Sequence, residues 1–407
     1  MPFLNDPINF IAGWAHGVLT GWGLVDSLAT IIIDLIGITI LIVFAMLLDI
    51  MLVWVERKVV ARFQDRLGPN RIGPFGLIQS FADIIKMVIK EDITPAGADR
   101  IVYNIAPVLA ASSVIILWAV LPLASSIYGV DLNVGLLYIV AAGSMGTLAI
   151  IMAGWSSNNK YALLGAFRMV ANMISYEIPM VIILLVPTIL ADTMSMRGIT
   201  QAQSGMWFVI LSPLAFIIFL ISAIAELGRS PFDLNEAESE IVSGFNVEYS
   251  GMKFGWFYAG ELLHAFTFGG FIAVLFFGGY GGFFGLEKIA FFAWLKNPFI
   301  QTVVFMAKAM FGYWVIMWIK YSMPRIRIDH MLAFNWKFLT PLALVVLVNT
   351  AILSKVLVNL PTWGYAMGMF FSNLVIGFIT IEILRAYGRK QRKVEDRPAA
   401  LVTQNLE

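Results

Sequence analysis

The chain carries nine long apolar segments, each of roughly the 20 residues that an α-helix needs to cross a bilayer. Their predicted bounds are 29–54, 101–124, 134–155, 169–191, 206–226, 255–280, 299–320, 338–358 and 363–384. Only 13% of the residues are charged, against about 25% in soluble domains. Backbone groups inside lipid must find their hydrogen bonds within the protein, which favours helices. The predicted fold is an all-α polytopic membrane bundle of about nine transmembrane helices.

The basic residues are distributed unevenly around these segments. Most of the 27 Lys and Arg fall in five regions, 55–100, 156–168, 227–254, 320–337 and 385–407. Loops rich in Lys and Arg remain on the cytoplasmic side of a membrane. We therefore expect the N-terminus outside the cell and the C-terminus in the cytoplasm.

Composition also limits the chemistry of the chain. It has no cysteine, which excludes disulfides and thiolate-held metal centres. His16, His264 and His330 lie far apart in sequence, so we expect no haem or metal site. A net charge of +1 suggests no nucleic-acid partner. If electrons are transferred, their carriers are expected in other subunits.

One segment after the first span has the pattern of a surface helix. In 75–90, apolar residues recur at helical spacing, and Gln79, Asp83, Lys86 and Lys90 occupy the opposite face. The segment is too short and too polar to cross a bilayer. We predict an amphipathic helix at the membrane interface. Either it simply rests on lipid, or its polar face lines a cavity.

A loop between two apolar segments gathers carboxylates. Asp233, Glu236, Glu238 and Glu240 fall within eight residues, and Glu226 lies just upstream. Carboxylates this close raise one another's pKa and can exchange protons as a group. A solvated acidic loop is the simpler interpretation, and the carboxylates inside the spans favour proton handling instead.

Three carboxylates lie within or at the end of predicted spans. Glu177 is near the middle of the fourth span, Glu226 ends the fifth, and Glu261 is about two turns into the sixth. Charged groups inside a membrane are costly and usually functional. These residues predict a proton path that begins at the inner surface. Asp49 is a weaker candidate, because near the inner end of its span the side chain can reach the surface.

Three stretches resemble a known family, the quinone-chamber membrane subunit (the H-type, or ND-one-type) of proton-pumping NADH:quinone oxidoreductase, respiratory complex I. The first comprises Glu56-Arg57-Lys58, Gln64–Asn70, Gly73–Gln79, Ala82-Asp83 and Lys90-Glu91. The second comprises Asn158–Gly165 and Ser175-Tyr176-Glu177. The third comprises Ala225-Glu226, Arg229–Asp233, Glu236-Ala237-Glu238 and Glu248-Tyr249-Ser250. The similarity covers about residues 20–357.

This resemblance implies roles for individual residues. A tunnel through which quinone enters is expected to involve Arg57, Gln64, Arg66, Asp83, Lys86, Arg325 and Arg327. The start of the proton path and the coupling loop are expected to involve Glu177, Glu226, Asp233, Glu236, Glu238, Glu240 and Glu261. The chain itself is expected to hold no catalytic redox group, no metal and no cofactor.

The resemblance also implies an assembly in a bacterial inner membrane. Quinone is the expected substrate, and FMN and iron–sulfur clusters are expected in partner subunits. Expected partners are the peripheral-arm subunits of the quinone site and the clusters, small membrane subunits, antiporter-like subunits and lipids. Two alternatives stay open. They are the anchor subunit of a related membrane-bound hydrogenase and a stand-alone proton-coupled transporter, which the lack of inverted repeats disfavours.

The predicted spans and the resemblance together suggest three parts. Residues 1–28 form an outer segment, 29–358 the eight-span quinone chamber, and 359–407 an additional span with a basic tail. Most members of the family have eight spans, so the ninth is expected to be an appendage of unassigned role.

Overall fold

The computed structural model describes residues 6–233, 242–281 and 294–404, with side chains up to residue 389. Within these ranges, eight helical segments are long and apolar enough to cross a membrane. They are α3 (Asp26–Phe63), α5 (Arg100–Leu117) with its 3-10 turn to Val120, α6 (Gly135–Ser156), α7 (Lys160–Ala191), α12 (Gly251–Phe276), α13 (Pro298–Ser322), α14 with α15 (Ile328–Val356) and α16 (Thr362–Gln404). The predicted helical membrane bundle is therefore confirmed.

The fifth predicted span differs from the others because it is broken. It consists of α9 (Phe208–Leu211) and α10 (Pro213–Glu226), with Ser212 between them. Pro213 has no backbone N–H to continue the ladder of α9, so the helix stops and restarts there. The 14-residue α10 is shorter than a full span, so the predicted span 206–226 is divided between two shorter helices.

The first span is longer than predicted. α3 is one helix of 38 residues, against the predicted 29–54, and it contains Glu56 and Arg57. At 1.5 Å per residue it is about 57 Å long, well beyond the thickness of a bilayer core. These two side chains are therefore held by a rigid helix rather than by a loop.

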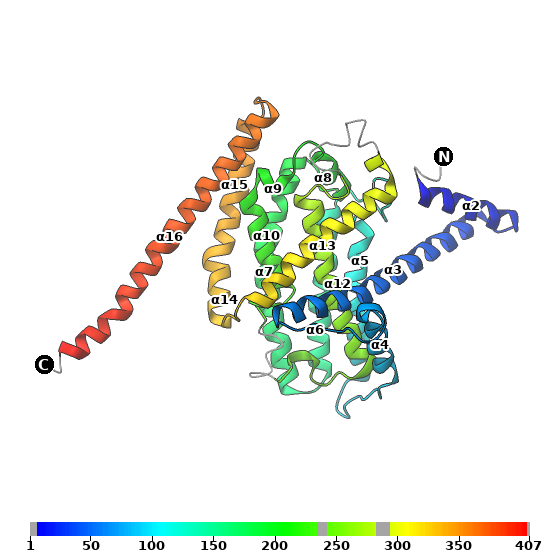
Figure 1. Ribbon diagram of the computed structural model, residues 1–407, viewed down its shortest axis with the longest axis horizontal. Coiled ribbons are helices and arrows are strands. Elements are labelled where there is room, and N and C mark those ends of the chain that lie inside the picture. Colours follow the sequence, from blue (N-terminus) through cyan, green and yellow to red (C-terminus); the bar gives the residue numbers. More distant parts are fainter. Residues whose placement is uncertain (1–5, 234–241, 282–293, 405–407) are drawn as a thin grey trace.

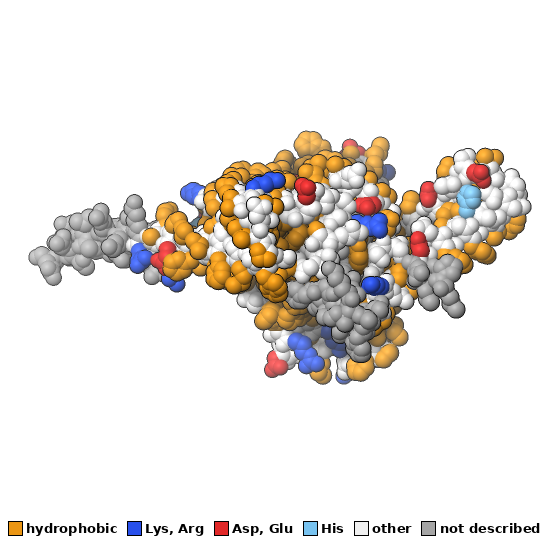
Figure 2. Space-filling view, turned by 90° about the horizontal axis from the view of Figure 1, so that it is seen from above, with side chains coloured by type: hydrophobic (Ala, Val, Ile, Leu, Met, Phe, Trp, Pro, Cys, Tyr) orange, Lys and Arg blue, Asp and Glu red, His pale blue; other side chains and the backbone are white. Residues whose placement is uncertain are grey.

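α12 lies at the centre of the bundle, and α3 and α16 extend away from it on opposite sides (Figure 1). In an 18-residue apolar stretch of each helix, 83% of the residues of α12 are buried, against 6% for α3 and 11% for α16. α12 packs mainly against α5 and α13, and α7 packs against α6, α10 and α15. Figure 2, seen from above the view of Figure 1, shows hydrophobic side chains over much of the surface, with Lys, Arg, Asp and Glu side chains scattered among them.

Loops at one end of the bundle are joined by hydrogen bonds between distant segments. The Tyr103 hydroxyl donates to the Glu248 carbonyl, and the Asn159 amide donates to the Glu248 side chain. The Ser230 hydroxyl donates to the Met323 carbonyl. The Ser250 hydroxyl donates to the Glu91 carbonyl at 3.4 Å. The basic regions 55–100, 156–168, 227–254 and 320–337 thus include segments that are joined to one another by hydrogen bonds.

A second set of loops meets at the other end. Ser195 precedes α8 (Met196–Ala202), and its hydroxyl donates to Asp131 at 2.5 Å. The Gln203 amide, just after α8, donates to the Val274 carbonyl near the end of α12. α2 (Pro7–Gly21) precedes α3 in the region predicted to lie outside. The first set of loops contains segments from the regions rich in Lys and Arg, and the second set lies between those regions.

The predicted amphipathic helix is present as α4 (Gln79–Ile89). Its apolar residues Ile85, Val88 and Ile89 are exposed, whereas Ser80 is buried. Ser80 and the largely buried Asp83 thus face the protein, whereas Ile85, Val88 and Ile89 face outward together with Lys86. Of the two predicted arrangements, the structure favours the one in which the polar face lines a cavity.

A proline inside α7 frees one carbonyl next to Glu177. Pro179 has no N–H, so the Ser175 carbonyl four residues earlier loses its helical donor. The Asn335 amide, in the π-helical turn Asn335–Leu339, donates to this carbonyl at 2.5 Å. The Tyr176 hydroxyl donates to the Met331 carbonyl at 3.0 Å. These two bonds fix the middle of α7 against the α14–α15 segment.

Candidate functional site

The bundle contains an open polar cavity beside the C-terminal half of α3. It has a volume of about 370 Å³ and is bordered by Glu56, Arg57, Arg66, Tyr258 and Tyr321. We call it the mouth cavity. Its lining is ionic and aromatic, because the charged turns of α3 face the ends of α12 and α13 here.

A second cavity, of about 140 Å³, lies between α3, α4 and α12. Most of its lining is apolar, and we call it the apolar cavity. Its polar lining includes Asp49, Arg57, Ser80, Asp83 and Tyr258. Arg57 forms an ion pair with Asp83, which ties α3 to α4. Arg57 also borders the mouth cavity, so the two cavities share one wall.

Four charged groups from separate segments meet in the protein interior next to the mouth cavity. Arg229 is 1% exposed, and its guanidinium lies 3.3 Å from Glu261 and 3.8 Å from Glu56. Lys320 pairs with Glu56 at 2.9 Å, and the Tyr321 hydroxyl donates to the same carboxylate. Two carboxylates thus face two cations, and the buried cluster is close to neutral overall. We call these four charged groups the ion cluster.

The end of α10 explains how Arg229 enters the interior. Gly228 adopts φ 61°, the left-handed conformation that glycine favours. The Arg229 N–H donates to the Ile224 carbonyl, and the Gly228 N–H donates to the Ala225 carbonyl. This Schellman pattern ends the helix and turns the chain back against it. Burial lowers the pKa of Arg229, but Glu56 and Glu261 outweigh burial and hold that pKa above its ordinary value.

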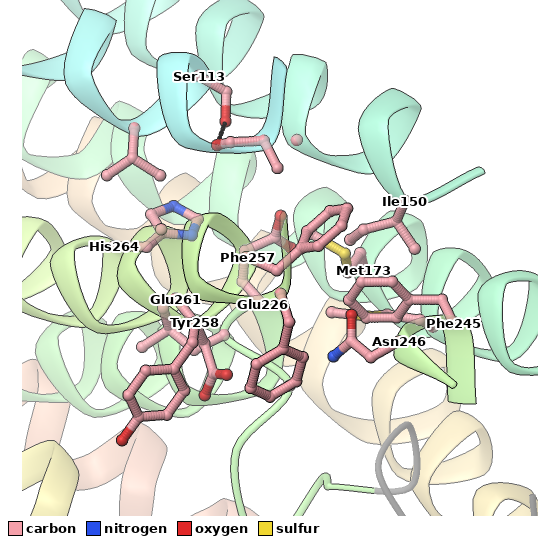
Figure 3. Close-up of a pocket in the computed structure, with 18 residues that line it drawn as sticks. Ser113, Ile150, Met173, Glu226, Phe245, Asn246, Phe257, Tyr258, Glu261 and His264 are labelled. Atoms are coloured by element: carbon pink, nitrogen blue, oxygen red, sulfur yellow. Dashed lines mark hydrogen bonds between the residues drawn. The ribbon is translucent and has the colours of Figure 1, made fainter. Parts of the chain in front are cut away.

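Two adjoining cavities lie farther into the bundle, and Figure 3 shows the residues of the first of them. The first, of about 100 Å³, is bordered by Glu226, Tyr258, Glu261 and His264. The second, of about 30 Å³, is bordered by Glu177, Glu226 and His264. We call them the carboxylate cavities. Glu226 is 6% exposed, and one of its oxygens has no hydrogen-bond partner among the described residues. A cavity that admits a water needs roughly 10–15 Å³, so both have room for water.

The structure brings several of the sequence-predicted residues together. Arg57, Arg66 and Asp83 border the mouth or apolar cavity. Glu177, Glu226 and Glu261 come from α7, α10 and α12 and border the carboxylate cavities. Tyr258 borders the mouth, the apolar and the first carboxylate cavity, and so connects the two groups.

Other predicted residues lie outside the lining of these cavities. Gln64 ends α3 and accepts a bond from Arg66. Lys86 is mostly exposed beside Asp83. Arg325 pairs with Asp233 at 3.0 Å, and Arg327 pairs with the exposed Asp329 at 3.2 Å. Glu236, Glu238 and Glu240 lie outside the described residues.

Sequence reasoning missed the importance of five residues. Glu56 and Arg229 are two of the four groups of the ion cluster. Asp49 borders the apolar cavity, and Tyr258 and His264 both border the first carboxylate cavity. Asp49 was expected to reach the surface, yet one of its carboxylate oxygens is buried without a hydrogen-bond partner among the described residues. Tyr258 and His264 each lie three positions from Glu261, a spacing that places all three on one helix face.

Comparison with known proteins identifies the family. A sequence profile described as NADH dehydrogenase matches residues 36–351. The chain belongs to the NADH dehydrogenase family. This match includes the described cavity residues and ends before α16. The boundary predicted at residue 358 stays a prediction.

Individual relatives extend this similarity over most of the chain. The H-type subunit of NADH-quinone oxidoreductase from Dehalococcoides mccartyi (strain CBDB1) is 45% identical over 318 residues, which cover 78% of this chain and 86% of the relative. The protein of the same name from Phocaeicola vulgatus is 42% identical over 343 residues, with 83% and 94% covered. That from Geobacillus kaustophilus is 43% identical over 315 residues, with 76% and 92% covered.

Proposed function

We propose that this chain is the membrane subunit of a proton-pumping NADH:quinone oxidoreductase, that it admits quinone from the bilayer, and that it begins the proton path. The observation that carries the proposal is the series of adjoining cavities. It runs from the polar mouth cavity, past the buried ion cluster, to the carboxylate cavities between α7, α10 and α12. The names of the relatives indicate the reaction, quinone reduction by NADH, and the cavities offer space for the quinone and for the proton path.

The apolar cavity suits a quinone tail. Its position between α3, α4 and α12, and its mostly apolar lining, match a long hydrocarbon chain. The exposed apolar side of α4 faces lipid, so an apolar substrate has a direct approach from the bilayer. The Arg57–Asp83 pair stands where this cavity meets the mouth cavity, and it offers polar contacts to a head group. The quinone is reduced in the adjoining subunit, with electrons from flavin and iron–sulfur clusters held by partner subunits.

The ion cluster connects the substrate to the proton path in this proposal. A charge change in the mouth cavity acts directly on Glu56 and, through Arg229, on Glu261. Glu261 borders the same cavity as Glu226, which in turn borders the cavity of Glu177. In a low-dielectric interior, moving one charge alters proton affinities along the series. Asp233, Glu236, Glu238 and Glu240 are proposed to contribute from the acidic loop.

The proposal includes the sidedness and the assembly. The mouth cavity opens at the cytoplasmic side of a bacterial inner membrane, against the peripheral arm. The N-terminus lies outside, and the C-terminus lies in the cytoplasm. Small membrane subunits and antiporter-like subunits continue the membrane arm.

The test replaces Glu177 by Gln in a strain that assembles the complex. Glu177→Gln keeps the shape of the side chain and removes its proton exchange, so proton pumping and coupled NADH-dependent quinone reduction are expected to fall at least tenfold. Electron transfer to an artificial acceptor that bypasses quinone is expected to remain. Glu382→Gln is the matched control, because Glu382 lies on α16 in an exposed pair with Arg385. Wild-type pumping in Glu177→Gln would contradict the proposal.

A further inference from the structure

One face of α12 carries three groups that can exchange protons. Tyr258, Glu261 and His264 follow one another at intervals of three residues, so their side chains lie along the same face. Figure 3 shows the three side chains beside the first carboxylate cavity, together with Glu226. Glu261 is part of the proposed proton path, and the other two are assigned no role there.

Tyr258 lies where three cavities adjoin. It borders the mouth cavity together with Glu56, the apolar cavity together with Asp49, and the first carboxylate cavity together with Glu261. A phenol at this position touches both the space proposed for substrate and the space that contains the buried carboxylates. Among the described residues, Tyr258 alone borders all three of these cavities.

His264 lies at the other end of the series. It borders both carboxylate cavities, and only in the second of them is Glu177 part of the lining. Figure 3 marks no hydrogen bond between His264 and the other cavity residues drawn there, and the ring packs against Phe268 at a centroid distance of 5.0 Å. Its nitrogens are therefore free to bond water in these cavities.

The chemistry of the two side chains suits a relay. A neutral imidazole accepts a proton at one nitrogen and releases one from the other. A tyrosine hydroxyl donates one hydrogen bond while it accepts another. Each group returns to its starting protonation state after a transfer, so only O–H and N–H bonds form and break and no charge accumulates. Water in the carboxylate cavities bridges the remaining gaps.

We infer that Tyr258 and His264 extend Glu261 into a proton relay along α12, which joins the mouth cavity to Glu177. This inference rests on the proposed function. The charged groups around the relay include Glu56, Arg57 and Arg229 at its Tyr258 end, and Glu226 and Glu177 at its His264 end. Arg229 holds the Glu261 carboxylate in place at 3.3 Å.

The test uses membrane vesicles that contain the whole complex. His264→Ala removes the relay group and leaves space for a small ring. Pumping and coupled quinone reduction are expected to fall at least tenfold, and added imidazole is expected to restore pumping several-fold. Thiophene has a ring of the same size that carries no transferable proton, and it is expected to restore nothing. If His264 had only a structural role, imidazole and thiophene would restore pumping equally.

Two further variants keep the inference testable if His264→Ala fails to assemble. His264→Gln keeps a polar side chain of similar length without the relay, and it is expected to lose pumping as well. Tyr258→Phe removes one oxygen, and it is expected to slow pumping several-fold and to change the solvent deuterium isotope effect on coupled turnover. His16→Ala is the control and is expected to match the wild type, because its helix α2 lies away from α12 in Figure 1.

The outcomes separate this inference from the proposed function. Loss of pumping in Glu177→Gln with wild-type rates in His264→Gln and Tyr258→Phe would overturn the relay and leave the proton path standing. Restoration of His264→Ala by thiophene as well as by imidazole would also overturn it. Wild-type pumping in Glu177→Gln would overturn the proposed function itself. Loss in all three, with rescue by imidazole alone, would support the relay.

Discussion

At the residue scale, the ion cluster decides how the interior holds charge. A lone guanidinium in a protein interior is strongly unfavourable, and it persists only with opposite charges close by. Arg229 has Glu56 and Glu261 at 3.8 and 3.3 Å, yet its nitrogens have no hydrogen bond of good geometry among the described residues. Arg229 is therefore held in the cluster by charge more than by directed bonds. Such an arrangement responds readily when a neighbouring charge changes.

The first prediction concerns this cation. Arg229→Met removes the charge and leaves two buried carboxylates facing each other, a loss of about 3–5 kcal/mol in the free energy of unfolding. We expect little assembled complex in membranes, measured by quantitative blotting of the native assembly.

A second substitution tests the cause. In Arg229→Met/Glu56→Gln the repulsion is relieved, so the amount of assembled complex is expected to rise again, whereas Arg229→Met/Glu382→Gln is expected to give no recovery. Equal recovery in the two double variants would contradict the electrostatic explanation.

At the element scale, α16 is fastened to the break between α9 and α10. Asn373 is 2% exposed, and its amide donates to the Leu211 carbonyl at 3.3 Å and to the Met369 carbonyl at 2.9 Å. The Ser212 hydroxyl donates to the Asn373 side chain at 3.3 Å. A helix break inside a membrane needs partners for its freed backbone groups. α16 supplies one of them, and α10 leads directly to Glu226.

The second prediction tests this attachment. Asn373→Leu removes both contacts with the break and leaves the Leu211 carbonyl without its side-chain donor, a cost of about 1–3 kcal/mol. We expect a lower thermal midpoint of the purified complex, measured by intrinsic fluorescence. Thr380→Ala is the control, since the Thr380 hydroxyl bonds only to the Ile376 carbonyl of its own helix. A midpoint unchanged from wild type in Asn373→Leu would argue against the role of α16 at the break.

At the scale of the whole molecule, the two sets of loops predict opposite sides of the membrane. The chain has no cysteine, so single cysteines report their position without interference. Ala96 lies among the loops predicted to be cytoplasmic, Ser204 lies at the other end, and both are exposed.

The third prediction follows from this arrangement. On intact cells, a membrane-impermeant maleimide is expected to label Ser204→Cys and to spare Ala96→Cys, and after lysis it is expected to label both. The measurement is the mass shift of the chain on a gel. Labelling of Ala96→Cys on intact cells would reverse the proposed sidedness.

The sequence by itself determined the architecture, because each apolar segment must satisfy its own backbone in lipid, and that requirement is local. Patterns within a single segment also sufficed for the amphipathic α4 and for the carboxylates Glu177, Glu226 and Glu261. The resemblance on which the family rests likewise uses contiguous stretches of sequence, and the comparisons confirm it.

Only the tertiary structure decided which of these groups share a cavity. Glu56, Arg229 and Lys320 are far apart in sequence, and nothing within any one segment says that they meet. Asp49 was judged by its depth in a helix, but which way it faces depends on the neighbours of α3. Burial and charge pairing are properties of the packed bundle, so the ion cluster and the joined cavities exist only after α3, α12 and α13 have packed together.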